Sequence, residues 1–181
     1  MRLAIVSDSH IPEQAPGLPE QFRERIDAAD QVVHAGDFGS REAYADVRAL
    51  SERLTAVYGN ADPVDIDLPA VGSLTAGGVT FVVSHGMVNV VERAVSSSEG
   101  VVFDRDDWLD AVADTARARA GTDGTVVGVG GHTHQVEDQV HDGIRVLNPG
   151  SATGVGPADG TATMMTAEVA EGDLDVTVHE A

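Results

Sequence analysis

The chain has 181 residues with thirty acidic and eleven basic side chains, which gives a formal net charge of −19. Every basic residue is arginine, so a Walker A phosphate loop, a kinase-type lysine and a Schiff-base mechanism are all excluded. The absence of cysteine likewise excludes disulfides and thiolate metal sites. The length and a hydrophobic content of 42% favour one folded domain over residues 1–181.

The acidity is interpreted as solvation in a salt-rich cytoplasm, because salt screens the self-repulsion of a highly charged protein. Binding to a basic partner is the alternative, and a GC-rich genome would also explain the replacement of lysine by arginine. The first ten residues hold an apolar run of four, too short for a signal peptide or a membrane span. We therefore expect a halophilic, cytoplasmic protein with no membrane contact and no nucleic acid as a tight partner. A homo-oligomer is left open.

Short apolar runs that end in polar clusters alternate with helical patterns along the first two thirds of the chain. The runs predict buried strands within residues 3–10, 31–37, 56–60, 81–86 and 126–134. Amphipathic patterns predict helices over residues 18–30, 40–54 and 104–120, the second with Ser40 as its N-cap. This alternation indicates crossover connections between parallel strands.

Three segments have the pattern of β-hairpins. Residues 136–148 have a turn signal at Asp142-Gly143, and residues 161–180 have one near Gly172. Residues 74–83 are a third candidate, with a turn at Gly77-Gly78. The predicted fold class is therefore α/β with strands of both directions.

The predicted strands end in potential metal ligands. Ligands of open α/β sheets bind at the carboxyl ends of strands, and residues i and i+2 of an extended chain face the same way. The side chains at these ends are Asp8, His10, Asp37, Asn60, His85, His132 and His134. Seven ligands are too many for one tetrahedral zinc ion and suit two divalent ions about 3.5–4 Å apart. Imidazole, carboxylate and amide together favour Mn, Fe, Co, Ni or Zn.

The order of these motifs resembles that of the calcineurin-like metallophosphoesterases. The motifs are D-x-H, G-D, G-N, H-G and G-H-x-H, and the short length and "NPGS" at residues 148–151 resemble the compact bacterial and archaeal phosphodiesterase branch. The resemblance implies a four-layer αββα sandwich of two mixed β-sheets flanked by helices. It also implies that one metal is held by Asp8, His10, Asp37 and His134, and the other by Asp37, Asn60, His85 and His132.

A phosphodiesterase acting on a small phosphate ester is the function this resemblance implies. Two divalent ions, with manganese favoured, would hold a bridging hydroxide that attacks phosphorus, and Asn60 would help to hold the phosphoryl oxygens. A phosphomonoesterase and a dinucleoside-polyphosphate hydrolase are alternatives. The retromer subunit of the same fold, which serves as a scaffold and lacks part of the ligand set, represents a non-catalytic alternative.

The chain departs from the family pattern in two places. Residues 59–62 read "GNAD", so Ala61 stands where many relatives have the histidine that is taken as the acid for the leaving group. Asp62 is then the candidate general acid. Residues 87–103 lengthen the connection after the H-G motif and are either a surface loop or a rim that shapes the substrate site.

Five other polar residues have weaker signals. His34 either orients Asp37 or packs within its strand, and His141 and His179 are expected on the surface of hairpins. Asn148 and Ser151 are expected to cap a turn near the site.

Overall fold

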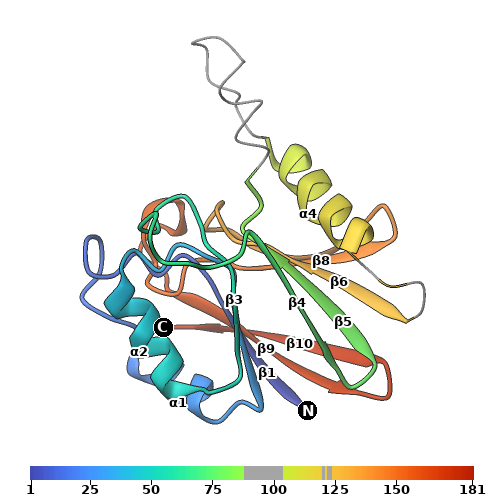
Figure 1. Cartoon of the computed structure of the whole chain (residues 1–181), viewed down its shortest axis with the longest axis horizontal. Helices are drawn as coiled ribbons and strands as arrows, with labels where there is room; N and C mark the ends of the chain where they lie inside the picture. The colour runs from blue at the N-terminus through green and yellow to red at the C-terminus, as the bar shows by residue number, and fades with distance from the viewer. Residues whose placement is uncertain (88–103, 120, 122–123) are drawn as a thin grey trace.

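Two stacked five-stranded sheets form the centre of the molecule in the computed structural model, which describes residues 1–87, 104–119, 121 and 124–181 (Figure 1). The first sheet has the order β10-β9-β1-β2-β3 and the second β4-β5-β6-β8-β7. The first sheet consists of β1 (Arg2–Val6), β2 (Gln31–His34), β3 (Leu54–Ala56), β9 (Thr163–Ala170) and β10 (Asp173–Glu180). The second consists of β4 (Val71–Ala76), β5 (Val79–Ser84), β6 (Thr125–Val129), β7 (Val136–His141) and β8 (Ile144–Pro149).

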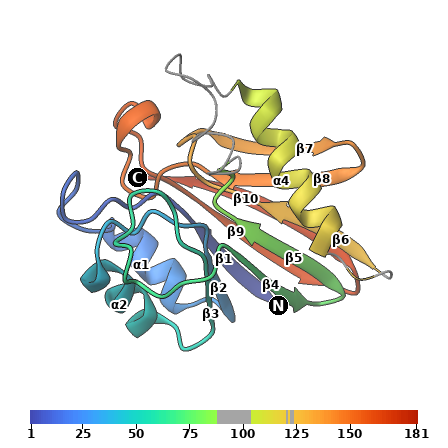
Figure 2. The same ribbon diagram turned by 45° about the horizontal axis from the view of Figure 1, so that its top comes forward.

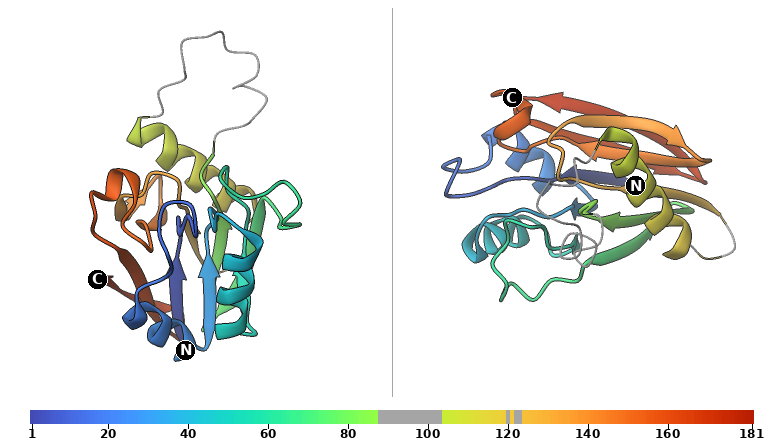
Figure 3. Two further views of the ribbon diagram at one scale, coloured as in Figure 1. Left: turned by 90° about the vertical axis from the view of Figure 1, so that its left-hand side faces the viewer. Right: turned by 90° about the horizontal axis from the view of Figure 1, so that it is seen from above.

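Both sheets are mixed. In the first sheet β1, β2 and β3 run parallel, and β9 pairs antiparallel with β1 and β10. In the second sheet β5, β6 and β8 run parallel, while β4 and β7 are antiparallel edge strands. In the left panel of Figure 3, β1 and β2 lie side by side with their arrowheads at the same end.

Alternating side chains of the strands separate the core into layers. Leu3 and Ile5 of β1 face the second sheet, whereas Ala4 and Val6 pack against the helices α1 (Glu20–Asp27) and α2 (Arg41–Leu50). On the opposite outer face, Trp108 of α4 (Arg105–Arg119) packs in a cluster with Val146 of β8. The helices therefore lie on the two outer faces of the sheet pair (Figure 2). The expected four-layer αββα sandwich is confirmed.

The predicted helices are present, but α1 is shorter at both ends than the predicted residues 18–30, and α2 ends before residue 54. Ser40 caps α2 by accepting a hydrogen bond from the Ala43 backbone N–H at 3.0 Å. The prediction that this helix continues to residue 54 is wrong, because Ser51 is extended and Leu54 begins β3, paired with Val32. Leu54 still packs against the core beneath α2, which is why its spacing resembled a helical face.

All three predicted hairpins are confirmed as β4–β5, β7–β8 and β9–β10. Each turn has two consecutive residues with positive φ, as a type I′ turn requires. These pairs are Gly77-Gly78, Asp142-Gly143 and Glu171-Gly172. Within the described residues, no helix is both long enough and apolar enough to cross a membrane.

The excess of acidic side chains leads us to expect that salt stabilises this fold. At molar ionic strength the Debye length is about 3 Å, so repulsion among surface carboxylates is almost fully screened. The thermal midpoint should rise by about 5 °C or more between ~0.1 M and ~2 M KCl, measured by circular dichroism. A lower midpoint at ~2 M KCl would contradict the halophilic interpretation.

Candidate metal centre

The loops that follow four parallel strands meet at one edge of the sandwich. Asp8 and His10 follow β1, and Asp37 follows β2. His85 follows β5, and the segment of residues 130–135 follows β6. Backbone hydrogen bonds join these loops in pairs, from Ser9 N to Asp37 O at 2.8 Å and from Gly131 N to His85 O at 3.3 Å. The carboxyl ends of strands from both sheets thus supply one site.

Unfavourable backbone conformations are concentrated in these loops. Five of the predicted ligand residues have positive φ, namely Asp8 (53°), His10 (48°), Asp37 (59°), His132 (72°) and His134 (57°). A positive φ costs a residue with a Cβ atom about 1 kcal/mol or more. The conformation therefore persists only where the surrounding structure holds it in place. Such strain is typical of functional sites, where side chains must point at a common centre.

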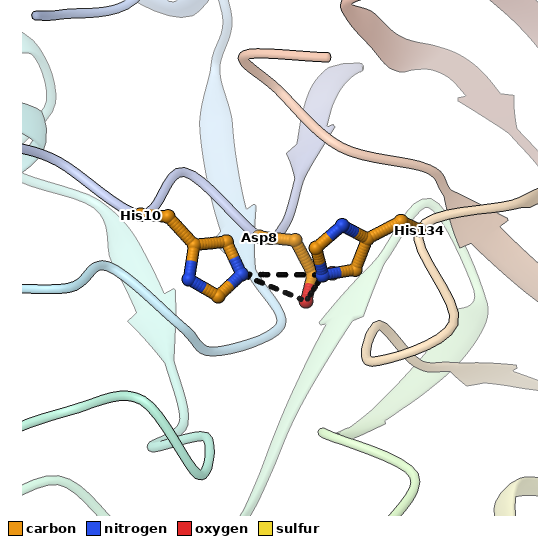
Figure 4. Close-up of side chains that lie close together, drawn as sticks. All are labelled: Asp8, His10 and His134. Atoms are coloured by element: carbon orange, nitrogen blue, oxygen red, sulfur yellow. Dashed lines mark hydrogen bonds and ion pairs between the residues drawn. The ribbon is translucent and has the colours of Figure 1, made fainter. Parts of the chain in front are cut away.

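Three groups of potential ligand atoms lie close together among the described residues, and two of them are at this edge of the sandwich. Asp8, His10 and His134 form the first of these two. In Figure 4 the Asp8 carboxylate lies between the two imidazole rings. Asp8 Oδ1 is 3.3 Å from His134 Nε2 and 3.9 Å from His10 Nε2, and the two Nε2 atoms are 3.2 Å apart. All three side chains have at most a tenth of their surface exposed.

The second group consists of Asp8, Asp37 and His85. His85 Nε2 is 3.3 Å from Asp37 Oδ2 and 4.0 Å from Asp8 Oδ1. Asp37 Oδ2 is also 3.6 Å from His10 Nε2, in the first group. Both carboxylates therefore contact imidazoles of both groups, as expected for neighbouring metal positions that share a ligand.

The hydrogen bonds of the imidazole rings fit divalent metal ions. His85 Nδ1 donates to the Ala35 carbonyl at 2.7 Å, and His134 Nδ1 donates to the Val155 carbonyl at 2.8 Å. These bonds leave each Nε2 lone pair directed at the carboxylates. His85 Nε2 is buried and has no hydrogen-bond partner among the described residues. A metal ion between this nitrogen and the carboxylates would satisfy it.

The electrostatics of the cluster also favour bound cations. Burial lowers the pKa of His85, but the close carboxylates of Asp37 and Asp8 outweigh burial and raise that pKa to about 9. Burial raises the pKa of Asp37, and His85 reverses this shift so that the pKa is lowered. Two buried carboxylates thus need positive charge beside them, and a divalent ion supplies it in place of the proton on His85.

Of the two remaining predicted ligands, His132 adjoins the cluster, whereas Asn60 is not brought into it among the described residues. The His132 ring lies edge-on to that of His85, with centroids 5.2 Å apart, and its backbone N–H donates to both oxygens of Asp8 at 3.1 Å. Burial lowers the pKa of His132, which favours the neutral form that binds metals. Asn60 is exposed in the turn after Gly59, next to Ala61, whose N–H donates to Asp37 Oδ1 at 2.7 Å.

Asp62, the predicted general acid, holds the backbone of this site through four hydrogen bonds. Its Oδ1 accepts hydrogen bonds from the N–H groups of Phe38 (2.7 Å) and Gly39 (3.1 Å). Its Oδ2 accepts from those of Asp37 (2.9 Å) and Gly59 (2.8 Å). Burial raises the pKa of Asp62, and three of these four donors, Gly59, Gly39 and Asp37, act against that rise. Both carboxylate oxygens are engaged as acceptors of backbone N–H groups, so Asp62 has a structural role here, and its role as general acid stays a prediction.

We predict that Asp62→Asn lowers stability by about 2–4 kcal/mol, because an amide nitrogen would face two backbone donors that lose their acceptor. Urea unfolding of the variant and the wild type measures this difference. Phosphate esters with good and poor leaving groups should be hydrolysed more slowly by the same factor. A selective loss on poor leaving groups would restore Asp62 as the acid.

Asn148 and Ser151 form hydrogen bonds to the loops that carry the predicted metal ligands. The Asn148 amide donates to the Gly131 carbonyl at 3.0 Å and to Thr133 Oγ1 at 2.9 Å. The Ser151 hydroxyl donates to the Asp8 carbonyl at 2.8 Å. The segment 148–151 thus joins the loop after β1 to the loop after β6, a larger role than the expected turn cap.

The other histidines lie outside the cluster. His34 is buried, stacks on Phe38 and contacts Ser9 Oγ at 2.9 Å, and burial lowers its pKa to about 3. Of the two roles expected for His34, these contacts support packing within its strand. His141 and His179 lie half-buried in the hairpins β7–β8 and β9–β10, where they contact Asp110 and Thr166.

Several groups that form hydrogen bonds with the predicted metal ligands could not be recognised from the sequence. The acceptors for His85 and His134 are the carbonyls of Ala35 and Val155, which any residue type would supply. The Ser7 hydroxyl donates to Asp8 Oδ2, although serine in a strand end has no pattern of its own. The predicted extension at residues 87–103 lies outside the described residues after Met87.

His and Asp side chains gathered at the strand ends of an αββα sandwich suit a two-metal phosphoesterase. The family model "Calcineurin-like phosphoesterase superfamily domain" matches residues 1–172. The chain belongs to this superfamily, and the resemblance noted from its motifs is confirmed.

Individual proteins of this family are similar over most of the chain. A probable metallophosphoesterase of Methanocaldococcus jannaschii is 29% identical over 154 residues, which cover 84% of this chain and 69% of that protein. The crystal structure of Chaetomium thermophilum Vps29 has a TM-score of 0.73 at 20% identity and covers 99% of this chain and 96% of its own. A structure described as a novel archaeal phosphodiesterase has a TM-score of 0.62 at 21% identity, with 99% and 100% covered.

Proposed function

We propose that the protein is a phosphodiesterase that acts on small phosphate esters with two divalent ions, manganese being favoured, in a salt-rich cytoplasm. The observation that carries this proposal is the buried His85 Nε2, which lacks a hydrogen-bond partner among the described residues and lies 3.3 Å from Asp37. The superfamily membership and the probable metallophosphoesterase among its relatives support it.

Each residue of the cluster has a defined part in this proposal. Asp8, His10, Asp37 and His134 would hold one ion, and Asp37, Asn60, His85 and His132 the other, so that Asp37 would be shared. Bound ions would supply Lewis-acid chemistry, which includes generating a nucleophile from water near neutral pH. Asn60, exposed beside the cluster, would donate its amide N–H to a phosphoryl oxygen.

The leaving group decides which esters react well. With Asp62 engaged by four backbone donors and alanine at position 61, the described residues after Gly59 offer no obvious acid for the departing oxygen. Activated aryl esters, whose leaving oxygen needs no proton, should therefore react faster than alkyl diesters such as intact DNA.

The charge of the protein favours diesters over monoesters. A diester carries one negative charge, whereas a monoester is nearly a dianion at neutral pH and is repelled more by a protein at −19. We predict faster hydrolysis of bis(p-nitrophenyl) phosphate than of p-nitrophenyl phosphate, each assayed with Mn²⁺ or Ni²⁺ at high salt. A clear preference for the monoester would overturn the diesterase assignment and leave a dimetal phosphoesterase.

A non-catalytic scaffold is the second candidate, because the fold is also that of Vps29. The chain has all seven predicted ligand residues, and the described residues bring six of them into one cluster, which favours the enzyme. A scaffold would bind metal without hydrolysing any phosphate ester, so the same assay separates the two candidates.

A further inference from the structure

A groove of about 230 Å³ adjoins the metal centre at His85. It lies where the loop before β4 and the end of β5 meet α4, which packs across β5 and β6 (Figure 2). Its lining residues are Tyr58, Ala70, Val71, Ser84, His85, Gly86, Met87, Ala111 and Thr115. The groove therefore borders a predicted metal ligand on one side and, through Tyr58, the strand end that leads to Asn60.

None of the described residues that line the groove carries a carboxylate or a guanidinium group. The larger groove between α1 and the strands β9 and β10 is lined by Arg2, Glu24, Arg25 and Glu168. Among the described residues that line the groove at His85, Tyr58, Ser84 and Thr115 supply uncharged polar groups beside apolar side chains. The Thr115 hydroxyl already donates to the Ala111 carbonyl at 2.7 Å.

We propose that this groove receives the ester substituent of a phosphate bound at the metal centre and selects an uncharged, partly apolar one. The inference rests on the proposed function. A phosphate beside Asp37 and His85 must direct its substituents out of the cluster, and the groove begins at His85. An aryl or similar uncharged group loses little hydration there, whereas a charged group would be desolvated without a partner.

The test changes the charge of the groove at Ala70, which is exposed and lies outside the cluster. The variants Ala70→Arg and Ala70→Asp are assayed with three p-nitrophenyl phosphodiesters whose second substituent is phenyl, carboxyphenyl or choline. The lowest salt that keeps the protein folded is used, because salt screens the introduced charge. The wild type should prefer the phenyl ester.

Ala70→Arg should raise kcat/KM for the carboxyphenyl ester relative to the phenyl ester by about fivefold. Ala70→Asp should raise kcat/KM for the choline ester relative to the phenyl ester by about the same factor. The matched control is Ala158→Arg and Ala158→Asp, in the groove beside His134, which should leave both ratios within about twofold.

Two kinds of failure are distinguishable. If the wild type hydrolyses the esters but the Ala70 variants leave the ratios unchanged, or the Ala158 variants change them instead, the groove proposal is wrong and the diesterase stands. If the wild type hydrolyses none of the esters with Mn²⁺ or Ni²⁺, the proposed function is wrong and the groove proposal with it.

Discussion

Asp37→Asn should reduce the hydrolysis of bis(p-nitrophenyl) phosphate by at least about a thousandfold. Substituting a residue that only orients a metal ligand lowers metal affinity or activity by about 10–100-fold. Asp37→Asn removes the charge of a ligand itself, so we expect a larger loss. Asparagine suits the site otherwise, because it tolerates the φ of 59° and keeps an oxygen for the Ala61 N–H. The loss should therefore come from weaker metal binding and not from unfolding.

Metal content shows whether the variant has lost metal, and circular dichroism of the same samples shows whether it is still folded. His179→Ala is the matched control, since this half-buried histidine contacts Thr166 on the far side of the first sheet and should leave turnover unchanged. If Asp37→Asn kept most of its turnover with a full complement of metal, the assignment of Asp37 would be wrong.

Gly131→Ala should lower both stability, by about 3 kcal/mol, and activity, by about a hundredfold. A methyl group at this position would overlap the Ser7 hydroxyl and come within 2.7 Å of Asp8 Oδ2. Both neighbours are fully buried, so the loop after β6 would have to move away from β1 and take His132 and His134 with it.

The control for Gly131→Ala is Gly17→Ala, because a methyl group there meets no heavy atom within 4 Å. Urea unfolding and the diester assay of both variants give the comparison. Activity retained in a destabilised Gly131→Ala would show that the approach of the two loops matters for folding but not for positioning the ligands.

The strands, helices and hairpins that build the layers of the fold could be predicted, because a short stretch of sequence indicates each of them. Short Val- and Ile-rich runs, helical spacing and Gly turns each determine a strand, a helix or a hairpin within a few residues. The end of α2 could not be predicted, since Leu54 has a helical spacing but packs on the same core from β3. Periodicity reports which side is buried and not where a helix ends.

The candidate site was visible in the sequence because its side chains follow the strands directly. What the sequence could not reveal is how backbone groups hold those side chains. Asp62 illustrates this, since its four donors come from two loops that are distant in sequence and adjacent only after folding. A carboxylate in "GNAD" is equally compatible with acid catalysis and with such a backbone role until the loops are in place.

The central claim is that the cluster at the strand ends binds two divalent ions and thereby hydrolyses phosphodiesters. The most direct test titrates metal-free protein with Mn²⁺ and measures bound metal and hydrolysis of bis(p-nitrophenyl) phosphate on the same samples. We predict that activity rises with occupancy and reaches its plateau at two ions per chain. A plateau at one ion per chain, or full occupancy without hydrolysis, would contradict the claim.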